Sequence, residues 1–111
     1  FNNANEGGLA SPRFSRVWFV NNQAGLGGAV GNRGIAGRCS PHFDGCVFIQ
    51  NIATRYGGGI YTDANAGGLA RVLVRSCVFY QNQAPSGPAI TSTGGSNGTL
   101  VVTVLGSTIV N

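Results

Sequence analysis

The stretch FSRVWFVNNQAGLGGAV at Phe14–Val30 decides the fold, because its pattern returns twice along the chain. It comes back as FDGCVFIQNIATRYGGGI at Phe43–Ile60 and as VRSCVFYQNQAPSGPAI at Val74–Ile90. In every copy an asparagine lies three residues after a phenylalanine. A glycine-containing run then follows and ends on Val or Ile. Self-similarity at a fixed spacing indicates a repeat architecture.

The repeat is 30 residues long. Residues 1–24 match residues 61–84 without a gap at ten positions, and halving that offset brings in the other copies. The second copy lacks one residue before Phe48 and carries an extra one near Tyr56, so its total length is unchanged. The units, or coils, are 1–30, 31–60, 61–90 and the partial 91–111.

Apolar residues alternate with a period of two inside each unit, as at Val72 and Val74, and glycine pairs interrupt any window long enough for a helix. A unit with two or three short strands cannot bury its own apolar face, whereas stacked copies can. A propeller blade, the competing interpretation, usually needs about 40 residues or more. We therefore predict an all-β, single-stranded parallel β-helix (β-solenoid) of about 30 residues per coil, roughly 3.7 coils and about 18 Å in height. Residues 1–111 then form a single solenoid domain or an excerpt of a longer one.

Stacked coils place equivalent residues above one another in columns. One column is expected to point inward as an aromatic stack: Phe19, Phe48, Phe79 and Ile109. A second is expected at a turn, where asparagine tolerates unusual backbone angles and where its amides can bond from coil to coil: Asn22, Asn51 and Asn82. The glycine pairs are expected at bends where a Cβ would collide with a neighbouring coil. We interpret all these positions as structural.

The tandem pairing of Phe-x-x-Asn with Gly-Gly-Ala-Ile/Val/Leu resembles the repeat of the chlamydial polymorphic outer-membrane proteins and related bacterial surface proteins. The first half stands at Phe19–Asn22, Phe48–Asn51 and Phe79–Asn82, and the second is intact only at Gly27–Val30. Later copies depart to Gly-Gly-Gly-Ile and Gly-Pro-Ala-Ile. The resemblance implies a right-handed β-helix in an extracellular or cell-surface location, used for adhesion or as a structural stalk. It supplies no catalytic residues.

The chain has few side chains that could act as acids, bases or nucleophiles in catalysis. The chain has three acids, Glu6, Asp44 and Asp63, which fall on separate parts of the coils, and Asp44 aligns with Arg75 as a surface ion pair. The one histidine, His42, lies about 13 Å along a strand from Cys46, too far for a nucleophile pair. We expect no catalytic, cofactor or metal site. The runner-up is a carbohydrate-binding or carbohydrate-cleaving β-helix, such as a polysaccharide lyase or hydrolase, with its active site outside this segment, so a glycan is a possible partner.

Three cysteines leave an odd count. Cys46 and Cys77 share a column, so adjacent coils bring their Cα atoms to about 4.8 Å, within disulfide range. Small buried thiols suit that column equally, because Val17 and Ser107 also occupy it. We favour buried thiols for the column and a loop position for Cys39.

The net charge of +4 comes from arginine alone, and lysine is absent. The arginines form no column, although four cluster loosely along the flank of one strand: Arg13, Arg16, Arg71 and Arg75. Such a basic balance suits nucleic acid or acidic glycans as partners. The repeated aromatics are assigned inward and are unavailable for base stacking, so we expect no nucleic-acid partner, and we favour solubilising surface charge as the role of the arginines. No apolar run approaches the ~20 residues of a membrane span, so no membrane insertion is expected.

If Cys46 and Phe48 face inward, their neighbours face outward as a strip that we call the apolar stripe: Trp18, Val20, Val47, Ile49, Val78, Tyr80, Thr108 and Val110. Exposed apolar surface of this kind usually marks a contact, here with another solenoid or a neighbouring surface protein, unless a loop covers it.

Asn97-Gly98-Thr99 is an N-glycosylation sequon in a Gly/Ser-rich turn, which makes Asn97 a candidate glycan site. The sequence thus favours a structural or adhesive segment of a fibre, stalk or passenger domain, assembling by coil stacking or through the stripe. Ice binding is the third hypothesis.

Overall fold

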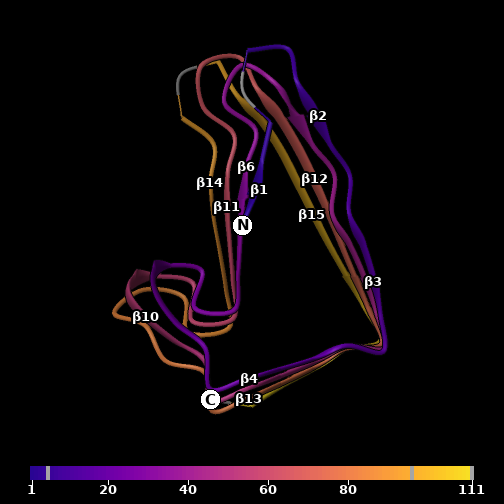
Figure 1. Cartoon of the computed structure of the whole chain (residues 1–111), viewed down its shortest axis with the longest axis vertical. Helices are drawn as coiled ribbons and strands as arrows, with labels where there is room; N and C mark the ends of the chain where they lie inside the picture. Colours follow the sequence, from indigo (N-terminus) through magenta and orange to yellow (C-terminus); the bar gives the residue numbers. More distant parts are fainter. Residues whose placement is uncertain (5, 96, 111) are drawn as a thin grey trace.

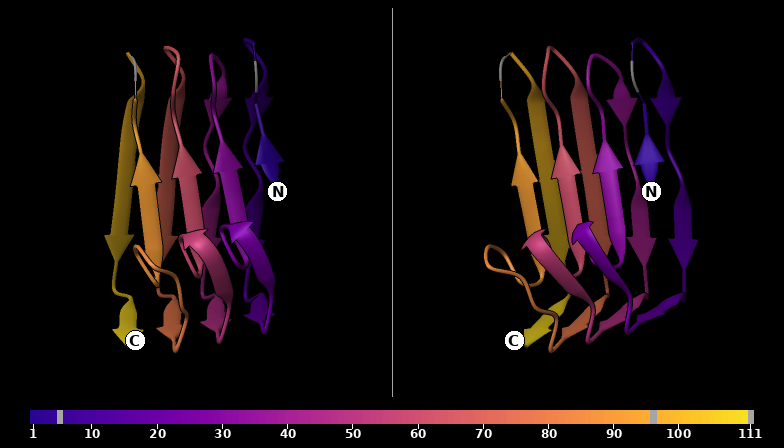
Figure 2. Two further views of the ribbon diagram at one scale, coloured as in Figure 1. Left: turned by 90° about the vertical axis from the view of Figure 1, so that its left-hand side faces the viewer. Right: turned by 60° about the vertical axis from the view of Figure 1, so that its left-hand side comes forward.

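The computed structural model describes residues 1–4, 6–95 and 97–110, and its strands wind into a parallel β-solenoid of about 4 turns with about 30 residues per turn. Figures 1 and 2 show that the chain runs clockwise down the solenoid axis while it recedes from the viewer, so the solenoid is right-handed. The predicted all-β right-handed parallel β-helix is confirmed. The shortest extent of the molecule, which lies along this axis, is 18 Å, the height expected from the strand spacing.

Each coil contributes to three parallel sheets that form the sides of a triangular cross-section (Figure 1). Sheet A contains β1 (Asn2–Asn3), β6 (Val30–Arg33), β11 (Ile60–Asp63) and β14 (Ile90–Thr93). Sheet B contains β2 (Leu9–Ala10), β3 (Arg13–Ser15), β7 (Arg38–Cys39), β8 (His42–Asp44), β12 (Leu69–Arg75) and β15 (Thr99–Leu105). Sheet C contains β4 (Trp18–Val20), β9 (Val47–Ile49), β13 (Val78–Tyr80) and β16 (Thr108–Val110). At the corner between sheets C and A an arm protrudes, made by β5 (Gln23–Leu26) and β10 (Ile52–Tyr56).

Two prolines explain why sheet B is broken in the first two coils and continuous in the last two. Pro12 and Pro41 lie between the short strand pairs β2/β3 and β7/β8, where a missing backbone N–H interrupts the ladder. The corresponding residues of the later coils are Val72 and Val102, which pair with each other inside the seven-residue strands β12 and β15.

The missing residue and the extra residue of the second coil both lie outside the regular strand pairing. The offset between partners is 30 residues in sheet A (Asn2 with Asn32) but 29 in sheet B (Leu9 with Arg38), so the missing residue belongs to the turn between these sheets. The extra residue is a bulge in β10, where the register shifts between Ala53 and Tyr56.

Phenylalanines fill the core in two stacked columns. The rings of Phe48 and Phe79 are parallel with centroids 4.5 Å apart, and Phe19 stacks on Phe48 at 4.7 Å. A second column from sheet B meets the first edge-on, with Phe43 5.6 Å from Phe48 at an interplanar angle of 67°. Ile109 pairs with Phe79 in the same inward column, and it is 47% exposed because in this structure no further coil packs over the last one.

Glycine is required at the corner where the arm returns to sheet A. Gly27, Gly57 and Gly87 occupy one column with φ of +61°, +66° and +60°, a region that L-residues rarely adopt. A Cβ on Gly57 would also lie 2.4 Å from the carbonyl oxygen of Ile60. The glycine runs that close the repeat therefore fix the turn that starts the next coil.

Candidate functional site

The asparagine column forms a continuous ladder between sheet C and the arm. Asn22 Nδ2 donates to Asn51 Oδ1, and Asn51 Nδ2 donates to Asn82 Oδ1, both at 2.9 Å. Each Oδ1 also accepts the backbone N–H of the asparagine in the preceding coil, at 3.0 Å. Asn51 and Asn82 are buried, so the ladder provides hydrogen-bond partners for amide groups that would otherwise have none in the core.

A positive φ angle occurs at the residue that precedes each ladder asparagine. Asn21, Gln50 and Gln81 have φ of +56°, +53° and +53°, whereas the ladder asparagines do not have positive φ. The expectation that the ladder residues themselves adopt the turn conformation is therefore wrong. The preceding residue turns the chain with its side chain in solvent, which leaves the asparagine free to point inward.

A second inward polar column, which the repeat analysis missed, runs up sheet A. Asn2 Nδ2 donates to Asn32 Oδ1 at 2.7 Å, and Asn32 Nδ2 donates to Thr62 Oγ1 at 3.3 Å. The column ends at Ser92, whose Oγ is buried and has no hydrogen-bond partner among the described residues. Asn2 and Asn32 are one period apart, so the signal was present in the sequence, but the change to threonine and serine hid it.

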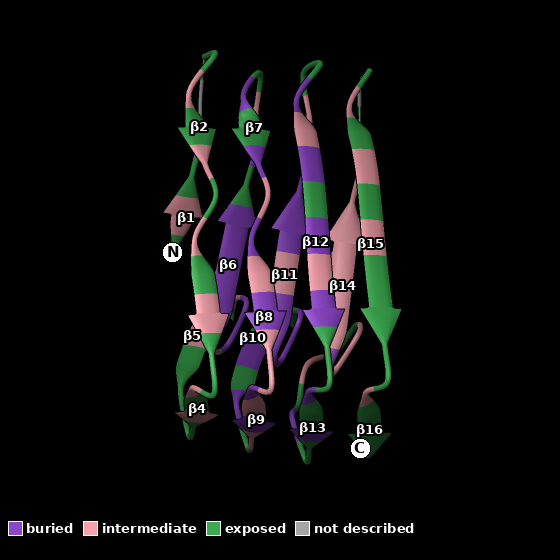
Figure 3. Ribbon diagram, turned by 90° about the vertical axis from the view of Figure 1, so that its right-hand side faces the viewer, coloured by how far each residue is buried: buried purple, intermediate pink, exposed green. Residues whose placement is uncertain are grey.

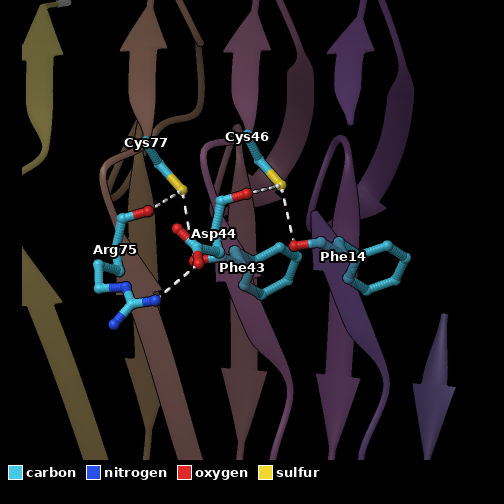
Figure 4. A network of polar contacts seen from close by, with 6 residues as sticks. All are labelled: Phe14, Phe43, Asp44, Cys46, Arg75 and Cys77. Atoms are coloured by element: carbon cyan, nitrogen blue, oxygen red, sulfur yellow. Dashed lines mark hydrogen bonds and ion pairs between the residues drawn. The ribbon is translucent and has the colours of Figure 1, made fainter. Parts of the chain in front are cut away.

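Two thiols occupy the corner between sheets B and C (Figure 4). Cys46 Sγ donates to the carbonyl oxygen of Phe14 at 3.3 Å, one coil away, and Cys77 Sγ donates in the same way to that of Phe43 at 3.6 Å. Burial raises the pKa of the Cys77 thiol, which keeps it protonated and able to donate. Both cysteines are free and fully buried, as the favoured interpretation of this column expects.

Cys39 is not a loop residue. It lies in β7 with its side chain fully buried, and burial raises the pKa of its thiol. The loop expectation overlooked that Cys39 pairs with Ala10 and Ala70, which extends a small-residue column of sheet B.

The acids do not gather into a catalytic group. Asp44 accepts a 2.8 Å hydrogen bond from Arg75 Nη2 on the outer surface of sheet B, and this bond, with the charge of Arg16, holds the pKa of Asp44 below its usual value. Asp63 lies in β11, where Asn65 Nδ2 donates to it and Arg33 is 4.0 Å away. No three His, Cys, Asp or Glu side chains within residues 1–4, 6–95 and 97–110 are close enough to hold a metal ion.

The apolar stripe lies on the outer side of sheet C. Trp18 pairs with Val47, which pairs in turn with Val78, and Val20 pairs with Ile49, which pairs with Tyr80. These two rows lie one residue to either side of the inward phenylalanines. Trp18 is 69% exposed and Tyr80 43% exposed, while Val47 and Ile49 are half-buried. Figure 1 shows no described segment beyond this sheet, so no loop of residues 1–4, 6–95 or 97–110 covers the stripe.

A hollow of about 360 Å³ lies on the outer side of sheet B. The side chains at its wall that point away from the core are those of β3, β8 and β12: Arg13, Ser15, His42, Asp44, Leu73 and Arg75. His42 therefore faces outward while Cys46 is buried, and the two do not form a nucleophile pair.

Asn97 lies in an exposed turn with φ of +57°, two residues before β15 begins at Thr99. The sequon is thus open to a glycosylating enzyme, and its occupancy stays a prediction. No helix in the described ranges is long and apolar enough to cross a membrane.

Comparison with known proteins found no matching family model, no matching curated protein and no matching solved structure. The class that the geometry defines is therefore the parallel β-solenoid itself.

Proposed function

We propose that the chain is a non-catalytic structural or adhesive β-helix of an extracellular fibre, stalk or cell-surface passenger domain. The observation that carries this proposal is the apolar stripe, an outer sheet face on which eight neighbouring positions hold no charged residue. Exposed apolar surface on this scale favours a contact with a second solenoid or a neighbouring surface protein.

The use of polar groups supports the same proposal. The buried asparagines are engaged in ladders that tie one coil to the next, and the acids are dispersed over different coils. Side chains that serve stacking are not available for catalysis. The resemblance of the Phe-x-x-Asn and Gly-Gly-Ala-Val motifs to polymorphic outer-membrane protein repeats adds the surface location to the proposal.

Light scattering tests the stripe. We expect the 11.4 kDa chain to assemble, and Trp18→Asp with Tyr80→Asp to reduce it to a monomer, because two charges would enter a contact that excludes water. Leu9→Asp with Val101→Asp is the matched control, since it removes two comparably exposed apolar side chains from sheet B.

Electron micrographs complete the test. Rods or filaments that persist in the Trp18/Tyr80 variant would move the contact from the stripe to coil stacking. Compact monomers of the unaltered chain that release reducing sugar from a polysaccharide would overturn the proposal in favour of a carbohydrate-cleaving β-helix.

A further inference from the structure

The outer face of sheet B combines a hollow with unpaired positive charge. In Figure 3 this face is turned toward the viewer, and exposed residues are interspersed along its strands with intermediate and buried ones. Four arginines point outward from it on three different coils: Arg13 on β3, Arg38 on β7, and Arg71 and Arg75 on β12. His42 stands beside Arg13 in the next coil and completes the hollow.

Only one of these arginines is neutralised by its surroundings. Arg75 pairs with Asp44 at 2.8 Å, whereas Arg13, Arg38 and Arg71 have no carboxylate within ion-pair distance among the described residues. Among the described residues, Asp44 is also the one acid on this face. The excess positive charge is therefore local to sheet B, and an exposed guanidinium binds carboxylate or sulfate through paired N–H donors.

The spacing of the arginines points to a polymer rather than to a single anion. Arg38 lies in the first outward row, Arg71 in the next, Arg13 with His42 in the third and Arg75 in the fourth. Outward rows are two residues apart, about 7 Å, so the charges extend over about 20 Å along the strands. No small anion reaches across that length, whereas a chain with repeated negative groups does.

The surroundings favour a sugar polymer over a nucleic acid. Between the arginines the outward side chains are hydroxylic or aliphatic apart from His42, such as Ser15, Leu73 and Thr103, and none on the described part of this face is Phe, Tyr or Trp. Non-specific binding of single-stranded nucleic acid relies on aromatic stacking of the bases. The backbone groups of sheet B are already used between coils, so an acidic peptide cannot add as a further strand on this face.

We propose that the outer face of sheet B binds an extended acidic polysaccharide through Arg13, Arg38, Arg71 and His42. This site is independent of the apolar stripe on sheet C. The substitutions Trp18→Asp and Tyr80→Asp should leave polysaccharide binding unchanged, so the two proposals fail separately.

Fluorescence anisotropy with labelled polymers tests the site at physiological salt. The probes are alginate as a carboxylate polymer, dextran sulfate as a sulfate polymer, neutral dextran, and single-stranded DNA of matched charge. We expect alginate or dextran sulfate to bind, neutral dextran not to bind, and the DNA to bind at least about tenfold more weakly. The acidic glycan that binds identifies the acid group, and raising the salt should weaken its binding.

Arg71→Glu should weaken this binding about tenfold, because it removes one cation and adds a repelling charge between the other cations of the face. Arg55→Glu, on the arm, is the matched control with the same change of net charge and should alter binding less than about twofold. Arg71→Gln gives a milder variant should the reversal disturb folding, and circular dichroism checks each fold. Failure of both acidic glycans to bind, equal losses for Arg71→Glu and Arg55→Glu, or DNA binding as tight as glycan binding would each overturn the proposal.

Discussion

Replacing Asn51 by alanine removes the central rung of the asparagine ladder. The Asn51 side chain donates from Nδ2 to the carbonyl oxygen of Phe19 and to Asn82 Oδ1, both at 2.9 Å. Its Oδ1 accepts from the Asn22 backbone N–H at 3.0 Å and from Asn22 Nδ2 at 2.9 Å. Because Asn51 is fully buried, alanine removes these four bonds from the core, although Asn82 Oδ1 still accepts the backbone N–H of residue 51 at 3.0 Å.

The expected loss follows from these four hydrogen bonds. At about 1 kcal/mol each they amount to about 4 kcal/mol, and a buried partner left unsatisfied costs more than an exposed one. Asn22 is exposed, so water replaces the bond of its amide, and the net loss is about 3 kcal/mol. A domain of this size is stable by about 5–15 kcal/mol in total, so the change should be large.

Urea unfolding followed by far-ultraviolet circular dichroism measures the loss as a shift of the midpoint at constant slope. Asn22→Ala is the matched control, because it removes a single side-chain bond from an exposed rung and should cost about 1 kcal/mol or less. The two variants losing the same free energy would refute the reasoning, since the ladder would then contribute no more in the core than at its end.

Three further predictions address the core, the thiol corner and the surface ion pair. Phe48→Ala should cost about 3–5 kcal/mol by the same urea assay, because the fully buried ring stacks on both neighbouring coils; a cost below about 2 kcal/mol would contradict the stacked core. Cys77→Ser should leave the stability nearly unchanged, since Ser107 already donates to the Leu105 carbonyl from this column. Cys77→Ala should cost about 1–2 kcal/mol because it removes the donor. Equal thermal midpoints for the two variants would show that the thiol bond contributes nothing to stability. The pKa of Asp44 is lowered by its bond to Arg75, so the small stability this pair provides is present at neutral pH and is lost as pH falls through that lowered pKa; Asp44→Asn should flatten this part of the pH profile.

The period of the sequence predicts the fold because stacking makes every coil repeat the same contacts. The inward columns of Phe19 and Asn22 follow directly, since each position has one environment that recurs 29 to 31 residues later. Even the local irregularity near Tyr56 is visible as an extra residue and is accommodated as a bulge. Periodicity does not report the backbone angle of a single residue, so the turn position at Asn21 was assigned one residue too late.

A repeat describes an average coil, so it predicts the direction of a side chain better than its exposure. Ile109 belongs to the inward column but is half exposed, because it stands in the last coil of the structure, where one side of the stack is open. Cys39 was separated from Ala10 and Ala70 because a small side chain carries little signal about burial, although all three pair in sheet B.

The outer faces obey a different rule from the columns, and this difference decides where functional information lies. An inward residue must match its neighbours one coil away, so it repeats, whereas an outward residue contacts solvent or a partner and is free to change from coil to coil. The arginines of sheet B show this: Arg13, Arg38 and Arg71 come from three coils and three rows, and thus form no column in the sequence. Only the fold brings them to one face. In a solenoid the repeat therefore predicts the scaffold, and the residues that break the repeat on a shared face are those to test for binding.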